Sequence, residues 1–343
     1  MAEPRQRCPD CEDQGSVWTR RTFLYRAGAT AAAALAPTLV VGQAQPASGP
    51  ETLVQRLYES LQPDQRKVVC FDWDHIDPDR GLLRTRVAAN WQITKPPVQS
   101  EFYKAEQQQL IRQIFEQIVN PEWHSRFDKQ LRDDAGGFGV HQSVALFGKP
   151  GQGKFEFVLT GRHQTIRFDG NSTEHAAFGG PIFYGHAASG FNEKPDHPGN
   201  IFWPQAVAAN DLFKMLDGKQ QAAALVQRAP DENKVDFRRG KSFDGIPIAE
   251  LSPDQKQAAQ RILEKLLEPF RPADREETLA CLKTQGGLDR CHLAFYAQED
   301  LGGDRVWDIW RLEGPAFVWH FRGAPHVHVW VNVADDPSLP LNA

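Results

Sequence analysis

The sequence lacks several features that would assign it to a large functional class. It has no basic stripe and a mild net charge of −5, so nucleic acid is not an expected partner. Neither an internal repeat nor a low-complexity tract is detectable. The apolar segment at residues 27–41 is too short and too weakly hydrophobic for a membrane span, and no second one follows. We therefore expect no stable membrane span in the mature form.

Common catalytic motifs are also missing. The chain has no G-x-S-x-G elbow and no H-E-x-x-H helix, which argues against the usual serine hydrolases and zinc peptidases. Residues 148–154 have the spacing of a phosphate-binding loop, but Phe155 stands where a magnesium-binding Ser or Thr is required. The residues that follow alternate like a strand, whereas such a loop must lead into a helix. We interpret this segment as a hairpin turn and expect no nucleotide there.

The first 47 residues are typical of an export signal. Arg20 and Arg21 form a twin-arginine motif, the alanine-rich segment 27–41 follows, and small residues at 42–47 suit a cleavage site. We therefore predict a signal peptide at residues 1–47, the twin-arginine export machinery as a partner, and a periplasmic or secreted mature protein. This route carries folded proteins, often with a cofactor already loaded.

Cysteine is scarce in the predicted mature chain. Cys8 and Cys11 would be removed with the signal, which leaves Cys70, Cys281 and Cys291. An oxidising compartment permits a disulfide, and Cys281 with Cys291 is the plausible pair. Cys70 lies in an apolar run and is expected to be a small buried hydrophobic residue.

Hydrophobic periodicity predicts a single α+β domain over residues 48–343. Helical spacing begins the mature chain, at residues 51–61 and 100–119. Strand-like alternation then marks two β blocks, at about 139–170 and 292–333, which flank a helical insertion at about 204–285. This order favours a mostly antiparallel β-sheet with a helical insertion and an N-terminal helical segment.

The most informative stretch is the strand-like run 326–333. Side chains alternate between the faces of a strand, so the valines at 327, 329, 331 and 333 form one apolar row. His326 and His328 then share the opposite face with Trp330 and Asn332. Two imidazoles two residues apart on one strand can bind a single metal ion.

Further ligands must come from other strands. His163 follows a predicted strand in the first β block, and we predict that it completes the site with His326 and His328. Weaker candidates are His186, after a glycine-rich segment, and His320, on the preceding strand. Three or four imidazoles would suit zinc, copper or non-haem iron. The alternative is that each histidine is simply hydrogen-bonded on a polar face.

Other residues near these strands could take part in chemistry. Arg162 could orient an anionic substrate, and Tyr184 or Glu313 could move a proton. Four tryptophans also cluster around the last strands, at positions 307, 310, 319 and 330. They predict either core packing or an aromatic wall for a flat or sugar-like ligand, and core packing is favoured for at least two of them.

Several segments resemble the uncharacterised domain-of-unknown-function family 3500. They are residues 147–163, the turn and strand at 314–317, the helix start at 251–255 and the ending at 325–330. Members often have a Gly-His-His step, a Gly-Pro-x-Phe element and a His-x-His followed by Trp. The resemblance implies that His163, His326 and His328 form the site. Arg162 stands where a second histidine is usual, so a ligand from that position would be absent.

These observations predict an exported metal-binding protein that could be a metal-dependent hydrolase or oxidoreductase. The competing hypothesis is a non-catalytic extracytoplasmic protein that binds a metal, a carbohydrate or another small molecule. An open coordination position would favour the enzyme, whereas a closed shell of four ligands would favour storage or structure.

Overall fold

A computed structural model of the chain describes residues 49–187, 199–240, 242–298, 300 and 307–339. Helices account for 39% and strands for 23%, and eight helices lie within the described ranges, which confirms the mixed helix and strand composition. The predicted signal peptide at 1–47 lies outside these residues. No helix in the described part of the chain combines the length and the apolar character needed to cross a membrane.

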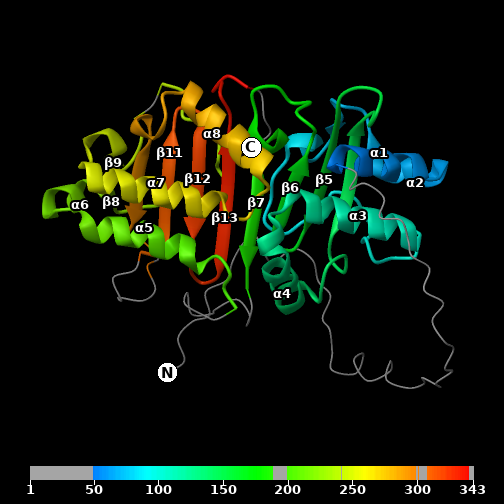
Figure 1. Ribbon diagram of the computed structural model, residues 1–343, viewed down its shortest axis with the longest axis horizontal. Coiled ribbons are helices and arrows are strands. Elements are labelled where there is room, and N and C mark those ends of the chain that lie inside the picture. Colours follow the sequence, from blue (N-terminus) through cyan, green and yellow to red (C-terminus); the bar gives the residue numbers. More distant parts are fainter. Residues whose placement is uncertain (1–48, 188–198, 241, 299, 301–306, 340–343) are drawn as a thin grey trace, which may run out of the picture.

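One large sheet runs through the molecule (Figure 1). Strands β4 to β7 of the first β block form one half, and strands β10 to β13 of the second form the other. The two halves meet where β7 pairs with β13. In spatial order the strands are β1 (Cys70–Phe71), β4 (Ser143–Gly148), β5 (Phe155–Gly161), β6 (Gln164–Phe168), β7 (Ile182–His186), β13 (Val327–Val333), β12 (Phe317–Arg322), β11 (Ile309–Gly314), β10 (His292–Tyr296) and β8 (Leu225–Val226).

The sheet is mixed, so the prediction of a mostly antiparallel sheet was wrong. Strand β1 pairs in parallel with β4, and β8 pairs in parallel with β10. Parallel neighbours require a long crossover connection, usually helical. The helical segments between β1 and β4, and between β8 and β10, provide it. A short strand β9 (Ile246–Pro247) also pairs with β10, and β2 (Ile76–Asp77) and β3 (Gly81–Leu82) form a separate small hairpin.

Helices cover one face of the sheet. Figure 1 shows α1 (Pro50–Ser60) and α3 (Ala105–Ile118) over the N-terminal half, and α5 (Trp203–Met215), α7 (Pro253–Leu267) and α8 (Pro272–Thr284) over the other. Helix α7 begins as predicted, because the Ser252 side chain caps it, Gln255 completes the capping box and Pro253 occupies its first turn. The helices α2 (Pro63–Val69), α4 (His124–Ala135) and α6 (Gly218–Ala224) complete the set.

Two segments without helix cover the other face, and we call them the first strap (residues 86–94) and the second strap (residues 231–239). In the first strap, the Ala88 carbonyl accepts a hydrogen bond from the Thr165 hydroxyl. In the second strap, the Val235 carbonyl accepts one from the Asn332 amide, at 2.9 Å. Ala89 and Val235 belong to one apolar cluster with Trp330. The straps therefore shield the polar face of the central strands.

Strand β13 has the alternation that its sequence predicts. Its four valines at positions 327, 329, 331 and 333 belong to the large core beneath the helices. Trp330 packs on the opposite side against the straps, and His328 shares that side. Trp310 and Trp319 also lie in the helix-side core, which confirms core packing for at least two tryptophans.

The expected disulfide is not formed. Cys70, Cys281 and Cys291 are all free thiols, and Cys281 and Cys291 are buried. The Cys291 sulfur packs against the backbone of Gly314, where an added Cβ would lie 2.7 Å from it. Burial raises the pKa of both thiols to about 12, so they are small buried hydrophobic groups rather than nucleophiles.

Gly185 lies in the β7–β13 pair, where the two halves of the sheet meet. A Cβ there would overlap the carbonyl oxygen of Val327 on β13 and lie 3.3 Å from Cδ2 of His163. We expect Gly185→Ala to separate β7 from β13 and to lower the free energy of unfolding by about 1–3 kcal/mol or more, as overpacking does. Urea denaturation measures this change.

Gly153→Ala is the matched control, because no atom lies within 4 Å of the Cβ it would add. This variant should have nearly the stability of the parent protein. Equal stability of the two variants would contradict the tight β7–β13 contact.

Candidate metal centre

Three histidines from two distant parts of the chain meet on the strap side of the sheet. One ring nitrogen of each of His163, His326 and His328 lies within 4.8 Å of the other two. All three residues have no exposed surface. The structure therefore brings together the three residues that the sequence nominated.

His163 is held in position by the turn between β5 and β6. Arg162 and His163 form a two-residue hairpin loop, and His163 has a left-handed φ of +53°, which is uncommon for a residue other than glycine. Its backbone N–H donates to the Ala89 carbonyl of the first strap at 3.0 Å, and its carbonyl accepts from Gly185 on β7 at 3.1 Å. These two contacts maintain the strained turn beside β7.

His326 and His328 come from the start of β13. His328 lies opposite Gly185 of β7 and opposite Arg322 of β12. The Nε2 atoms of His326 and His328 are 3.0 Å apart, and their rings are nearly perpendicular, at 80°. The His163 ring centroid lies 5.1 Å from that of His326 and 5.2 Å from that of His328.

Asp134, near the end of α4, holds the His163 ring. Its Oδ2 contacts Nδ1 of His163, and its Oδ1 accepts a 2.8 Å hydrogen bond from Nε of Arg162. Burial alone would raise the pKa of this carboxyl, but His163 and Arg162 outweigh it and hold the pKa well below the usual range. An ionised Asp134 accepts a hydrogen bond from Nδ1–H of His163, which leaves the lone pair of that ring on Nε2. That Nε2 has no hydrogen-bond partner among the described residues.

Glu232, in the second strap, holds the His328 ring in the same way. Its Oε1 lies 2.9 Å from Nδ1 of His328, and its Oε2 lies 3.1 Å from Nε of Arg322. Each of these two histidines thus has a carboxylate on Nδ1, and each carboxylate also binds an arginine. The Nε2 atoms of His163 and His328 therefore lie on the side of each ring that is away from its carboxylate and toward the other histidines.

This geometry fits a metal ion. Histidines that bind metals usually donate their other ring N–H to a carboxylate or carbonyl, which fixes the tautomer and the ring orientation. In a tetrahedral zinc site with Zn–N bonds of about 2.05 Å, ligand nitrogens are about 3.3 Å apart. The 3.0 Å separation of His326 and His328 and the 4.8 Å limit for the trio are within small side-chain adjustments of that value.

The two weaker ligand candidates lie outside the three-histidine group. His186 is one residue beyond Gly185 on β7 and so lies on the helix side, where burial lowers its pKa to about 4. His320 is on the strap side, but its Nδ1 accepts a 3.1 Å hydrogen bond from Nε of Arg311. Burial, together with Arg311 and Arg322, lowers its pKa well below the usual value. His320 is therefore a neutral residue in an arginine-rich contact.

The three candidates for substrate or proton handling are found in different places. Arg162 lies beside the histidines, with 23% of its side chain exposed. Glu313 is buried on β11 and pairs with Arg238 at 3.0 Å and with Arg311 at 3.7 Å. Tyr184 is on the helix side, where its hydroxyl donates to Gln205 at 3.0 Å and accepts from Trp319 at 3.1 Å. Arg162 alone of these three shares a partner with a histidine of the cluster.

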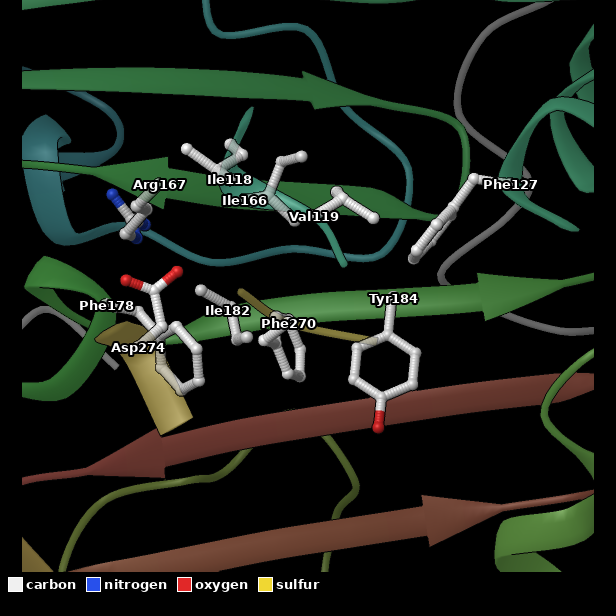
Figure 2. A pocket seen from close by; sticks show the side chains of 10 residues that line it. All are labelled: Ile118, Val119, Phe127, Ile166, Arg167, Phe178, Ile182, Tyr184, Phe270 and Asp274. Carbon is white, nitrogen blue, oxygen red and sulfur yellow. The ribbon is translucent and has the colours of Figure 1, made fainter. Parts of the chain in front are cut away.

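Tyr184 instead lines a small apolar cavity under the helices. Figure 2 shows its ring beside Phe270 and Ile182, with the hydroxyl directed away from the cavity. The cavity volume of about 20 Å³ is enough for one water molecule. It is therefore a packing defect in the core and lies on the opposite side of the sheet from the histidines.

Sequence reasoning missed Asp134 and Glu232. Asp134 follows Asp133 near the end of an amphipathic helix, before Gly136 and Gly137, where acidic residues usually face solvent. Glu232 lies in a polar segment without periodicity. The apolar spacing of Phe127 and Leu131 could have revealed α4. The residues next to Asp134 and Glu232 in the sequence, however, do not indicate that these carboxylates contact His163 and His328.

The sequence from residue 43 to residue 333 matches the family described as "Protein of unknown function (DUF3500)", and the chain therefore belongs to it. This result confirms the family resemblance found in the sequence. No curated protein and no solved structure matches the chain.

Tyr184→Phe tests the assignment of Tyr184 to the core. We expect the free energy of unfolding to fall by about 1–2 kcal/mol, because buried Trp319 and Gln205 each lose a hydrogen-bond partner. Urea denaturation measures the loss, and the metal content of the purified protein should equal that of the parent. Unchanged stability with altered metal content would instead connect Tyr184 to the histidines.

Proposed function

We propose that this member of the DUF3500 family is an exported metal-binding protein in which His163, His326 and His328 hold one metal ion. The observation that carries the proposal is the convergence of three buried rings whose nitrogens lie within 4.8 Å of one another. Asp134 and Glu232 support it, because they occupy Nδ1 of two rings and direct Nε2 toward the common centre.

The energetics of burial also favour a cation. A buried polar atom without a partner costs about 1–3 kcal/mol, and Nε2 of His163 is such an atom within the described structure. A metal ion would satisfy this lone pair and those of the neighbouring rings together. Neutral imidazoles are the form that binds metals.

Three histidines suit zinc, copper or non-haem iron, and the three-ligand set favours an enzyme. Structural zinc sites usually have four protein ligands, whereas catalytic sites keep one position for water or substrate. The His/Cys/Asp/Glu group found in the described chain has three members. A bound ion would supply Lewis-acid chemistry for a hydrolase or redox chemistry for an oxidoreductase.

A non-catalytic metal-binding protein is the second candidate. The complete burial of the three histidines favours it, because substrates need access to a catalytic ion. A carbohydrate receptor has less support, since Trp310, Trp319 and Trp330 are buried and offer no exposed aromatic wall. Export rests on the twin-arginine motif at Arg20 and Arg21, which predicts loading of the ion before translocation.

Elemental analysis of natively exported protein tests the metal site. We expect about one equivalent of zinc, copper or iron per chain, and its loss from the His326→Ala/His328→Ala variant, because two of three ligands are removed. Equally negligible metal content in both proteins would contradict the proposal.

His141→Ala is the control for removing a histidine, because His141 is exposed and lies outside the cluster. Its metal content should equal that of the parent. Circular dichroism checks that the double variant is folded. X-ray absorption of the metal in the parent protein provides an independent readout, and it should show imidazole nitrogen ligands.

Asp134→Asn and Glu232→Gln test the two carboxylates as positioning residues. Each variant should weaken metal affinity by about 10–100-fold, the usual effect of losing the partner that orients a histidine ligand. Competition with a chromophoric chelator measures the affinity. Unchanged affinity in both variants would mean that the histidine rings do not need these carboxylates to bind the ion.

A further inference from the structure

The two carboxylates behind the histidines are each shared with an arginine. Asp134 contacts His163 and Arg162, and Glu232 contacts His328 and Arg322. The two arrangements come from unrelated parts of the chain, yet both place an arginine, a carboxylate and a ligand histidine in one row.

Because each carboxylate is paired with an arginine, the net charge near the proposed ion differs from that of a usual histidine–carboxylate site. A carboxylate behind a ligand histidine normally offsets part of the charge of the metal. Here each carboxylate is also paired with a guanidinium, so the two Arg–carboxylate pairs carry no net charge. The three neutral imidazoles contribute none either. The positive charge of a bound dication therefore stays large in a buried setting, where Coulomb interactions are stronger than in water.

We propose that Arg162 and Arg322 make the metal centre selective for an anionic group, such as a carboxylate, as the additional ligand of the ion. This inference rests on the proposed function, because it requires the ion. It gives the substrate or bound ligand a chemical class, namely a small anion or a molecule with an anionic end.

The positions of the two arginines support this role. Arg162 is the residue before His163 in the hairpin loop, and Arg322 lies opposite His328 in the register of β12 and β13. The same backbone that places two ligands therefore places the two cations. The histidines are fully buried, whereas 23% of the Arg162 side chain and 10% of the Arg322 side chain are exposed. The arginines are thus the partly exposed members of the two rows, whereas the histidines are buried.

Cobalt(II) provides the test, because its visible spectrum reports a change of ligand. Protein reconstituted with cobalt is titrated with acetate, a probe for the carboxylate class, and with neutral imidazole. In the parent protein, acetate should saturate the site and change the spectrum. In Arg162→Gln and Arg322→Gln, the dissociation constant for acetate should rise about tenfold for each lost charge, whereas that for imidazole should stay the same.

Matched variants separate charge from shape. Arg162→Lys and Arg322→Lys keep the positive charge but lose the planar fork, and they should keep the acetate affinity within about threefold of the parent. Arg238→Gln is the control, because Arg238 pairs with Glu313 and Asp244 and contacts neither Asp134 nor Glu232 among the interactions described. Its acetate affinity should equal that of the parent.

The outcomes distinguish the two proposals. Failure of the parent protein to bind cobalt would overturn the metal site itself. Normal cobalt binding with the same acetate affinity in the parent and both Gln variants would overturn the inference alone. An equal loss of acetate and imidazole affinity would also overturn it, because the arginines would then shape the site rather than attract charge.

Discussion

The pairing of β7 with β13 is the contact on which the arrangement of this protein depends. It joins two β blocks that are separated in sequence by a long helical region, and so turns two half-sheets into one. Gly185 on β7 bonds to the backbone of His163 and lies opposite His328. One glycine therefore aligns the two halves of the sheet and brings His163 of the first half close to His328 of the second. Any side chain at this position would push the strands and the histidines apart.

The two faces of the sheet have different roles. The helix side carries the large hydrophobic core, including the four valines of β13, and supplies most of the apolar burial. The strap side carries the charged and hydrogen-bonding residues, including the three histidines, Arg311 and Arg322. Side chains on a strand alternate, so one strand serves both roles at once. The straps keep water from the polar face and also contribute to it, since Glu232 comes from one strap and Ala89 from the other holds the His163 backbone.

Electrostatic balance at the histidines is maintained by shared carboxylates. A buried carboxylate is costly unless it is paired, and Asp134 and Glu232 each have two partners. Each carboxylate orients an imidazole and anchors an arginine with separate oxygens. The carboxylates thereby fix the orientation of the His163 and His328 rings, which a selective site for the proposed ion would require. The same pairing explains how two arginines can lie close to the proposed metal site.

Local patterns in the sequence were sufficient for part of this result. The alternation of β13, the capped start of α7 and the pairing of His326 with His328 on one face depend on residues near one another in the chain, and His163 was nominated from its place after a predicted strand and from the family resemblance. Short-range periodicity and capping chemistry encode such features directly. The mixed sheet, the free cysteines, the separation of Tyr184 and His186 from the cluster, and the carboxylates of Asp134 and Glu232 were decided by the tertiary structure. They depend on which strands become neighbours and which segment covers which face of the sheet. These contacts join residues far apart in sequence, and the short-range pattern around each residue does not indicate its distant partner.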